Sequence, residues 1–456
     1  MLNLALTAVV ALLFVIGIRR PFVWVLAYLY IDILAPQKVS WGFLSAIPIS
    51  LIAFILAFAG WALFDDKRDS RFTLRQGLIA VLLVYCGLTT LGADFPVNAG
   101  EKWAWVWKAL VFAIFLPLTL RTRLRIEAAA LIMVLTIGML IIDGGIKTLG
   151  GGGGYGTLRL FVDDNSGLYE GSIISAVAIA VIPLIAWLMK HGTVFPSDWR
   201  VKLFGAALIF SCLLIPIGTQ ARTGLVCIAV VAVLSLRSVK RRFLYVTLAA
   251  LAVVVAIPFL PASYTARMST IENHESDQSA STRVEVWKWT LDYVREHPFG
   301  GGFDAYRGNS IRVETRKAVQ HGSTVTVEVG HTYDKARAYH SSYFEMLGEQ
   351  GWPGLIVWLW LMLSGLWQME RLRQRWKRRT GEGETWQAPL AEALQHSLLV
   401  YMVGSLFVGI AFQPFCYMLI GLQIGLWSYL QRIESQRPQV RPQRPRLIVP
   451  DAVAAG

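Results

Sequence analysis

Apolar runs of nearly the length that crosses a bilayer recur along most of this 456-residue chain. Because lipid offers no hydrogen-bond partners, only helices and closed barrels satisfy their backbone polar groups inside a membrane. The runs are continuous rather than alternating, which indicates helices. A water-soluble domain with 55% hydrophobic and 16% charged residues would expose large apolar patches. The sequence therefore predicts an all-α polytopic membrane protein.

The apolar pattern predicts 12 or 13 transmembrane helices. The predicted spans are 1–18, 21–36, 46–64, 77–93, 103–120, 126–146, 169–189, 202–219, 221–236, 243–260, 354–369, 391–410 and 415–431. Only Arg19 and Arg20 separate the first two segments. The count is 12 if one of these two segments is interfacial or half-inserted, and 13 if both cross. Residues 1–18 lack a basic start and a small-residue cleavage site, which favours a retained span over a signal peptide.

Basic residues gather in loops that follow alternate spans, around 67–75, 121–125, 190–202, 237–242 and 371–379. The positive-inside rule places such loops in the cytoplasm. The net charge of +13 is then a sign of topology, and no nucleic-acid partner is predicted. The polar interval 261–353 falls on the opposite face, which is the periplasm if the protein lies in a bacterial inner membrane.

Four regions follow from this pattern. Residues 1–260 form an N-terminal transmembrane bundle with a periplasmic loop at 147–168, and residues 261–353 form a large, partly helical periplasmic loop domain. Residues 354–431 form C-terminal spans, and the Pro- and Arg-rich tail 432–456 is predicted to be disordered and cytoplasmic.

The polar interval holds five of the seven histidines and one clear helical pattern. Thr282 followed by Glu285 predicts a capping box. The apolar face of this helix is predicted to comprise Val284, Trp287, Leu291 and Val294. A second helical stretch is predicted at about 339–348. The segment 303–337 reads either as a basic funnel for phosphates or as a solvated loop, and the loop is slightly favoured.

A set of basic side chains is predicted on the periplasmic face. It comprises Arg159, Arg222, Arg283, Lys335 and Arg337. Planar guanidinium groups bind phosphates through paired hydrogen bonds, so the set favours a phosphate-bearing lipid substrate. Arg222 is predicted to lie at the membrane surface. From that position alone, snorkelling to lipid headgroups or pairing with a carboxylate explains an arginine there as well as phosphate binding does.

His340 is the candidate general base, because the ordinary pKa of histidine suits proton transfer near neutral pH. A single histidine near a helix start is more often structural. Glu345 and Glu349 are the first two carboxylates after His340 in sequence, and either could orient the ring. No His/Asp/Glu spacing predicts a metal site, and no Walker A loop, GxSxG elbow or Rossmann fingerprint is present, so neither metal nor cofactor is predicted.

Several short motifs occur in order along the second half of the chain. They are TQARTG at 219–224, Arg283 with Trp287, HPFGGG at 297–302, YHSSY at 339–343 and EQGWPG at 349–354. Together they resemble the O-antigen ligase and polymerase superfamily over about 210–430. The N-terminal part resembles ligases associated with exosortase systems.

The resemblance implies a metal-independent, GT-C-type glycosyltransferase with a periplasmic site. Such ligases move a glycan from undecaprenyl pyrophosphate to a sugar hydroxyl of lipid A-core. By position, Arg222 and Arg283 would hold the pyrophosphate and His340 would activate the acceptor. The remaining expected substrate-binding residues are Arg159, Lys335, Arg337 and Tyr339. Ser341 and the pair Gln220-Ala221 depart from the pattern of many relatives, which leaves the acceptor open.

Three alternatives are carried forward. An O-antigen polymerase or a protein O-oligosaccharyltransferase would share the donor and differ only in the acceptor. A lipid or glycan transporter is expected to show inverted repeats or broken spans with charges at the midplane, and the sequence shows neither pattern.

Overall fold

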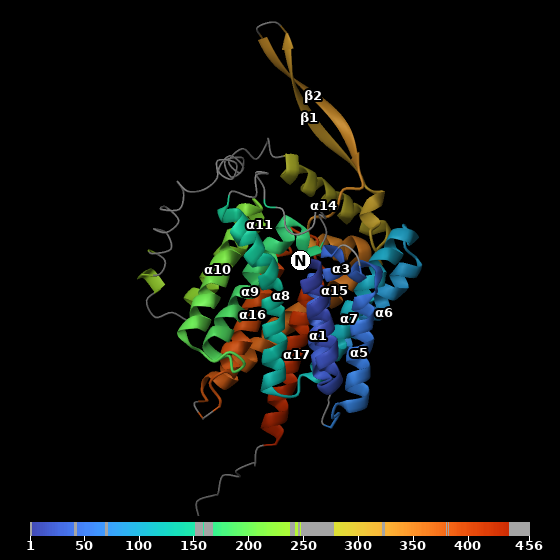
Figure 1. The fold of residues 1–456 in the computed structure, drawn as a ribbon. Helices are drawn as coiled ribbons and strands as arrows, with labels where there is room; N and C mark the ends of the chain where they lie inside the picture. Colours follow the sequence, from blue (N-terminus) through green and yellow to red (C-terminus); the bar gives the residue numbers. More distant parts are fainter. Residues whose placement is uncertain are drawn as a thin grey trace, which may run out of the picture.

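The computed structural model describes residues 2–40, 43–68, 72–150, 158, 167–237, 242–244, 247, 278–321, 324–379, 381 and 383–436. These residues form a helical bundle with a β-hairpin at one end (Figure 1). Arg159, most of the predicted span 243–260 and the tail after residue 436 lie outside the described residues.

The N-terminal half contains α1 (Leu2–Arg19), α2 (Phe22–Leu34), α3 (Pro36–Val39), α4 (Phe43–Ala46), α5 (Ile49–Phe64), α6 (Leu74–Leu91), α7 (Pro96–Thr119), α8 (Arg123–Leu149), η2 (Gly167–Tyr169) and α9 (Gly171–His191). The rest contains α10 (Trp199–Gly218), α11 (Arg222–Leu236), α14 (Gln278–Glu296), η5 (Ala305–Gly308), β1 (Ser310–His321), β2 (Thr324–Lys335), α15 (Ser342–Lys377), α16 (Gln387–Gly404) and α17 (Pro414–Ser435).

Among the described residues, six helices are long and apolar enough to cross a membrane: α1, α6, α7, α8, α9 and α10. Helices α2, α5 and α11 are apolar but shorter. A multi-pass helical membrane protein is therefore confirmed, whereas the count of 12 or 13 spans stays a prediction.

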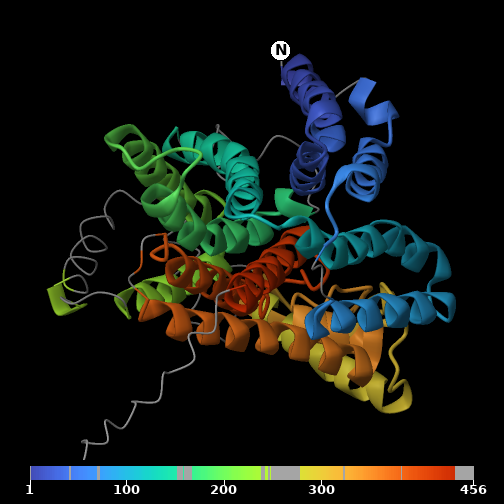
Figure 2. The ribbon, with the colours of Figure 1, turned by 90° about the horizontal axis from the view of Figure 1, so that it is seen from below.

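Helix α17 lies in the middle of the bundle, as the view along the helices shows (Figure 2). Gly421 and Gly425 bring it close to α7, because a Cβ on either would lie within 3 Å of Leu116 or Leu120. Small residues four apart allow such backbone approach in membrane bundles, where packing rather than water drives association. Helix α1 is peripheral, with only three of its residues buried.

The hairpin corrects the all-α expectation and the preference for a loop at 303–337. Strands β1 and β2 pair antiparallel, from Ser310 opposite Lys335 to His321 opposite Thr324, and the hairpin projects beyond the bundle (Figure 1). The sequence TVTVEV in β2 alternates β-branched residues, which favour extended backbone. This alternation is the signal that could have predicted the hairpin.

Helix α14 also differs from its prediction. It begins at Gln278, so Thr282 lies inside the helix and does not cap it. The buried face comprises Val286, Thr290 and Val294, whereas Val284 is 43% exposed and Leu291 is 41% exposed. The predicted apolar face was therefore correct at Val294 and at Trp287, which packs against Val286, and wrong at Val284 and Leu291.

Candidate functional site

Two glycine-rich motifs join α14 to α15. The N–H groups of Gly301 and Gly302 donate to the carbonyls of Gly348 and Glu349 at 3.1 and 2.9 Å. Gly300 has φ +82°, and a Cβ there would lie 2.5 Å from the Glu349 carbonyl oxygen, so only glycine fits. The HPFGGG and EQGWPG motifs therefore fix the position of α14, which carries Arg283, relative to α15.

The segment that contains His340 is held at both ends. The Asn309 side chain accepts from the Arg337 N–H at 2.9 Å and donates to the Arg337 carbonyl at 2.7 Å. At the other end, the Ser342 N–H donates to the Ser405 carbonyl at 2.8 Å, and its hydroxyl donates to the Val408 carbonyl at 2.9 Å. The backbone around His340 is therefore anchored to the hairpin base and to the α16–α17 connection.

Left-handed backbone occurs at three non-glycine residues in or beside the predicted site. Gln220, Ala336 and His340 have φ values of +53°, +57° and +47°. This conformation costs energy in residues with a Cβ and persists only where surrounding contacts enforce it, often at functional sites. The left-handed backbone of His340 therefore agrees with a role in which the orientation of its imidazole ring matters.

Tyr339 was expected to bind substrate, but its side chain is buried inside the protein. Its side chain is 2% exposed, and its phenol packs against Gly348. Its carbonyl accepts a hydrogen bond from the Trp287 indole at 2.9 Å, and that indole stacks on Phe344 with ring centroids 4.8 Å apart. Tyr339 therefore positions the neighbouring His340 from within the protein.

His340 is exposed, and two positively charged side chains, Arg283 and Arg337, act on its ring. Partial burial, and then the charges of Arg283 and Arg337, hold the pKa of His340 below its ordinary value of 6.5. A neutral imidazole can accept a proton from a hydroxyl near neutral pH. The structure thus brings three of the predicted residues into electrostatic contact.

Glu170 links Arg283 to the turn that carries Arg222. Burial raises the pKa of Glu170, and the charge of Arg283 opposes that rise. Glu170 immediately precedes α9, whose first residue, Gly171, would place a Cβ 3.1 Å from Thr219. The sequence reading missed Glu170, although a carboxylate directly before an apolar run on the arginine-rich face was a usable signal.

Arg222 is the first residue of α11 and is half-buried. The turn before it packs on α9, since the Thr219 and Ser175 hydroxyls lie 2.8 Å apart. A cation at a helix N-terminus opposes the helix dipole, whereas an anion there is stabilised by the dipole and by free N–H groups. An anionic ligand at this position could therefore bind both the Arg222 guanidinium and the N-terminus of α11.

Lys335 and Arg337 lie further out. Lys335 ends β2 and is exposed, and Arg337 forms an ion pair with Asp334. These residues can form the outer rim of a basic site.

Glu345 and Glu349 do not orient His340 in this structure. Both bind Lys102, with Nζ to carboxylate oxygen distances of 2.7 and 2.8 Å. Glu345 also accepts from the Ala411 N–H at 2.9 Å, and Glu349 from the Asp304 N–H at 3.0 Å. The sequence reading missed Lys102 because it directly precedes a predicted span, where a lysine usually snorkels.

The fold and this geometry define a multi-pass membrane protein whose site combines a histidine with arginines. Residues 205–359 match a family model described as O-antigen ligase, and residues 1–193 match one described as a family of unknown function, DUF5935. Residues 205–359 therefore carry an O-antigen ligase domain, which supports the resemblance to the O-antigen ligase superfamily. No curated protein matches it. The ligase match includes Arg222, Arg283 and His340, and it supports a ligase-type or polymerase-type glycosyltransferase in the inner membrane.

Proposed function

We propose that this protein is an O-antigen ligase at the periplasmic face of the bacterial inner membrane. It would transfer O-antigen polysaccharide from undecaprenyl pyrophosphate to a sugar hydroxyl of lipid A-core. The observation that carries the proposal is His340, exposed, in left-handed backbone and close to Arg283, inside the region that matches the ligase family.

The residues divide the chemistry as follows. Arg222, at the start of α11, and Arg283, on α14, bind the pyrophosphate and stabilise the charge that develops as it leaves. The acceptor oxygen attacks the anomeric carbon while the bond from that carbon to the phosphate oxygen breaks, and the electron pair stays on the pyrophosphate. His340 takes the hydroxyl proton. Direct attack inverts the anomeric centre, and no nucleotide is needed because the donor is already activated.

Lys335 and Arg337 would contact the phosphates of lipid A-core at the rim, and Arg159 is proposed to join the donor site. Tyr339 supports the site through its contact with α14. Metal independence is proposed because Glu345, Glu349 and Asp304 all lie within 4.0 Å of Lys102, whose positive charge occupies the place a metal ion would take among them.

The proposed orientation agrees with the arrangement of the helices. The hairpin and α14 lie at one end of the bundle, and α17 runs toward the other end (Figure 1). A periplasmic hairpin and a cytoplasmic C-terminus are compatible with that arrangement, and with basic loops on the side of the C-terminus.

The acceptor decides between the ligase and its two enzymatic alternatives. Purified protein is incubated with undecaprenyl-pyrophosphate glycan, EDTA and, in parallel, lipid A-core, a second lipid-linked glycan or an acceptor protein. A ligase is expected to modify only lipid A-core. Elongated donor would indicate a polymerase, and labelled protein an oligosaccharyltransferase. If the donor stays intact with every acceptor, the enzyme proposal fails and a transporter is favoured.

The acidic limb of the pH profile tests the role of the histidine. A general base must be neutral, and burial with the charges of Arg283 and Arg337 lowers the pKa of His340. We therefore expect kcat/KM to stay high down to about pH 6.5 and to fall only below it. In Arg337→Gln, loss of one positive charge raises the pKa, so the limb moves to higher pH. Arg307→Gln, which removes an arginine paired with Asp304, is the control. An unmoved limb in Arg337→Gln contradicts this assignment.

A further inference from the structure

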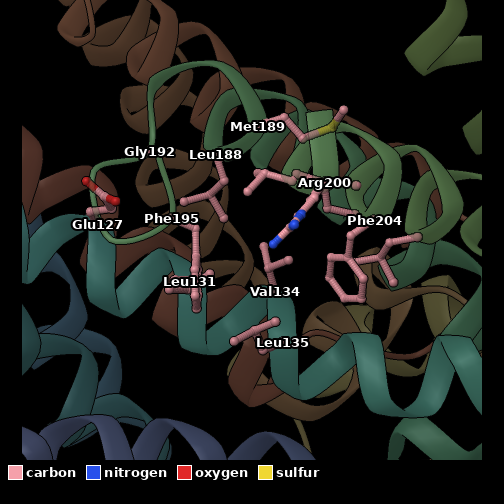
Figure 3. A pocket seen from close by; sticks show the side chains of 14 residues that line it. Glu127, Leu131, Val134, Leu135, Leu188, Met189, Gly192, Phe195, Arg200 and Phe204 are labelled. Atoms are coloured by element: carbon pink, nitrogen blue, oxygen red, sulfur yellow. The ribbon is translucent and has the colours of Figure 1, made fainter. Parts of the chain in front are cut away.

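A cavity of about 380 Å³ lies between α8, α9 and α10. Its lining is almost entirely apolar, with Leu131 and Val134 from α8, Leu188 from α9 and Phe204 from α10 (Figure 3). The α9–α10 connection lies at the end of the bundle away from the hairpin (Figure 1). The cavity is therefore separate from the candidate catalytic site.

The side chain of Arg200 enters this cavity from the first turn of α10. Figure 3 shows its guanidinium directed toward Val134, among apolar side chains. The Trp199 ring lies 5.6 Å from this guanidinium, and the ion pairs in the described part of the chain do not include Arg200. A guanidinium in apolar surroundings at a membrane is costly without an anionic partner.

The acidic residue of the cavity lining, Glu127, already accepts hydrogen bonds from the α9–α10 connection. It lies at the opposite end of the cavity in Figure 3. Its carboxylate accepts from the Thr193 N–H at 2.5 Å, the Thr193 hydroxyl at 2.6 Å and the Val194 N–H at 2.7 Å. Glu127 therefore stabilises the α9–α10 connection and does not pair with Arg200, which is exposed at the edge of the cavity and can bind an anion from outside the chain.

The aromatic residues beside Arg200 indicate its depth. Trp199 is 69% exposed and Phe195 is 53% exposed, and aromatic side chains of this kind gather at the membrane interface. Arg200 then lies at the level of lipid phosphates, and the cavity leads from it toward the hydrocarbon region. Lys190 on α9 is exposed on the same face and lies outside the cavity lining.

We propose that the cavity binds an anionic phospholipid, with its phosphate on Arg200 and one acyl chain between α8, α9 and α10. The volume falls within the range of small-molecule sites, about 300–1,000 Å³. The lipid would hold α10 against its neighbours, and α10 leads directly into the turn at 219–221 that precedes Arg222.

Native mass spectrometry tests the proposal on the purified full chain. The protein is exchanged into phosphatidylglycerol and phosphatidylcholine of identical acyl chains, at equal concentration. One phosphatidylglycerol is expected to be retained per chain in preference to phosphatidylcholine. Arg200→Gln is expected to weaken its retention about tenfold, because a charge-assisted hydrogen bond is lost. Val201→Trp, which fills the cavity mouth, is expected to abolish retention.

Lys190→Gln is the matched control, since it removes an equal charge from the same face without touching the cavity. Its lipid retention should equal that of the wild type. Equal retention of both lipids, an undiminished signal in Arg200→Gln, or an equal loss in Lys190→Gln overturns the proposal. If either cavity variant elutes as aggregate, the wild-type competition between the two lipids decides the outcome by itself.

Discussion

Replacing His340 by alanine is expected to lower the transfer rate by about 10²–10⁴-fold, the usual contribution of a positioned general base. The effect should fall on kcat, because the donor contacts of Arg222 and Arg283 are untouched. Initial rates of glycan transfer from undecaprenyl pyrophosphate, at saturating donor, measure it directly.

The backbone of His340 makes asparagine the better companion variant. At φ +47°, alanine is strained, whereas asparagine adopts left-handed backbone readily and supplies no base. His340→Asn should therefore elute and melt like the wild type while losing as much activity as His340→Ala. His297→Ala, an exposed histidine stacked on Tyr293, should keep its activity. Full activity in His340→Asn would refute the base assignment.

Replacing Lys102 by methionine is expected to destabilise the protein more than any surface change. Lys102 holds Glu345 and Glu349, whose side chains are 9% and 0% exposed, and removal of its charge leaves buried carboxylates without compensation. Breaking a buried ion pair by removing one partner costs about 3–5 kcal/mol. Thermal melting in one fixed detergent should show a large fall in Tm.

Two variants separate charge from shape in this cluster. Lys102→Met combined with Glu349→Gln should recover part of the lost stability, because one uncompensated carboxylate is removed. Lys288→Met breaks an exposed pair with Glu285 and should cost about 0–1 kcal/mol. Equal melting temperatures for Lys102→Met and Lys288→Met would show that the buried cluster contributes little.

Much of the helical architecture followed from hydropathy alone. The predicted spans at 126–146 and 169–189 correspond to α8 and α9, because long apolar runs have no alternative in lipid. Outside the spans, water can satisfy the backbone polar groups, so an apolar or polar run no longer implies one structure. The predicted start of α14 was five residues too late, and the hairpin was missed, because local signals there compete without a membrane to decide between them.

The candidate site was also predicted only in part. His340 and Arg283 could be proposed as site residues from residue chemistry and motif order, and in the structure the charge of Arg283 lowers the pKa of His340. The positions of Tyr339, Glu345 and Glu349 depend on packing between distant segments, which the sequence does not reveal. Tyr339 turned inward because Gly348 leaves room for its ring, and Glu345 and Glu349 were claimed by a lysine about 240 positions earlier in the chain.

The base of the hairpin has an evolutionary consequence. The chain leaves at Ser310 and returns at Lys335, and Asn309 bonds directly to Ala336 and Arg337 just beyond the return point. The excursion between those points is a side branch whose length does not alter the path of the chain into His340. A shorter, longer or exchanged branch is therefore expected to change what the protein meets beyond this end of the bundle without moving the proposed catalytic site.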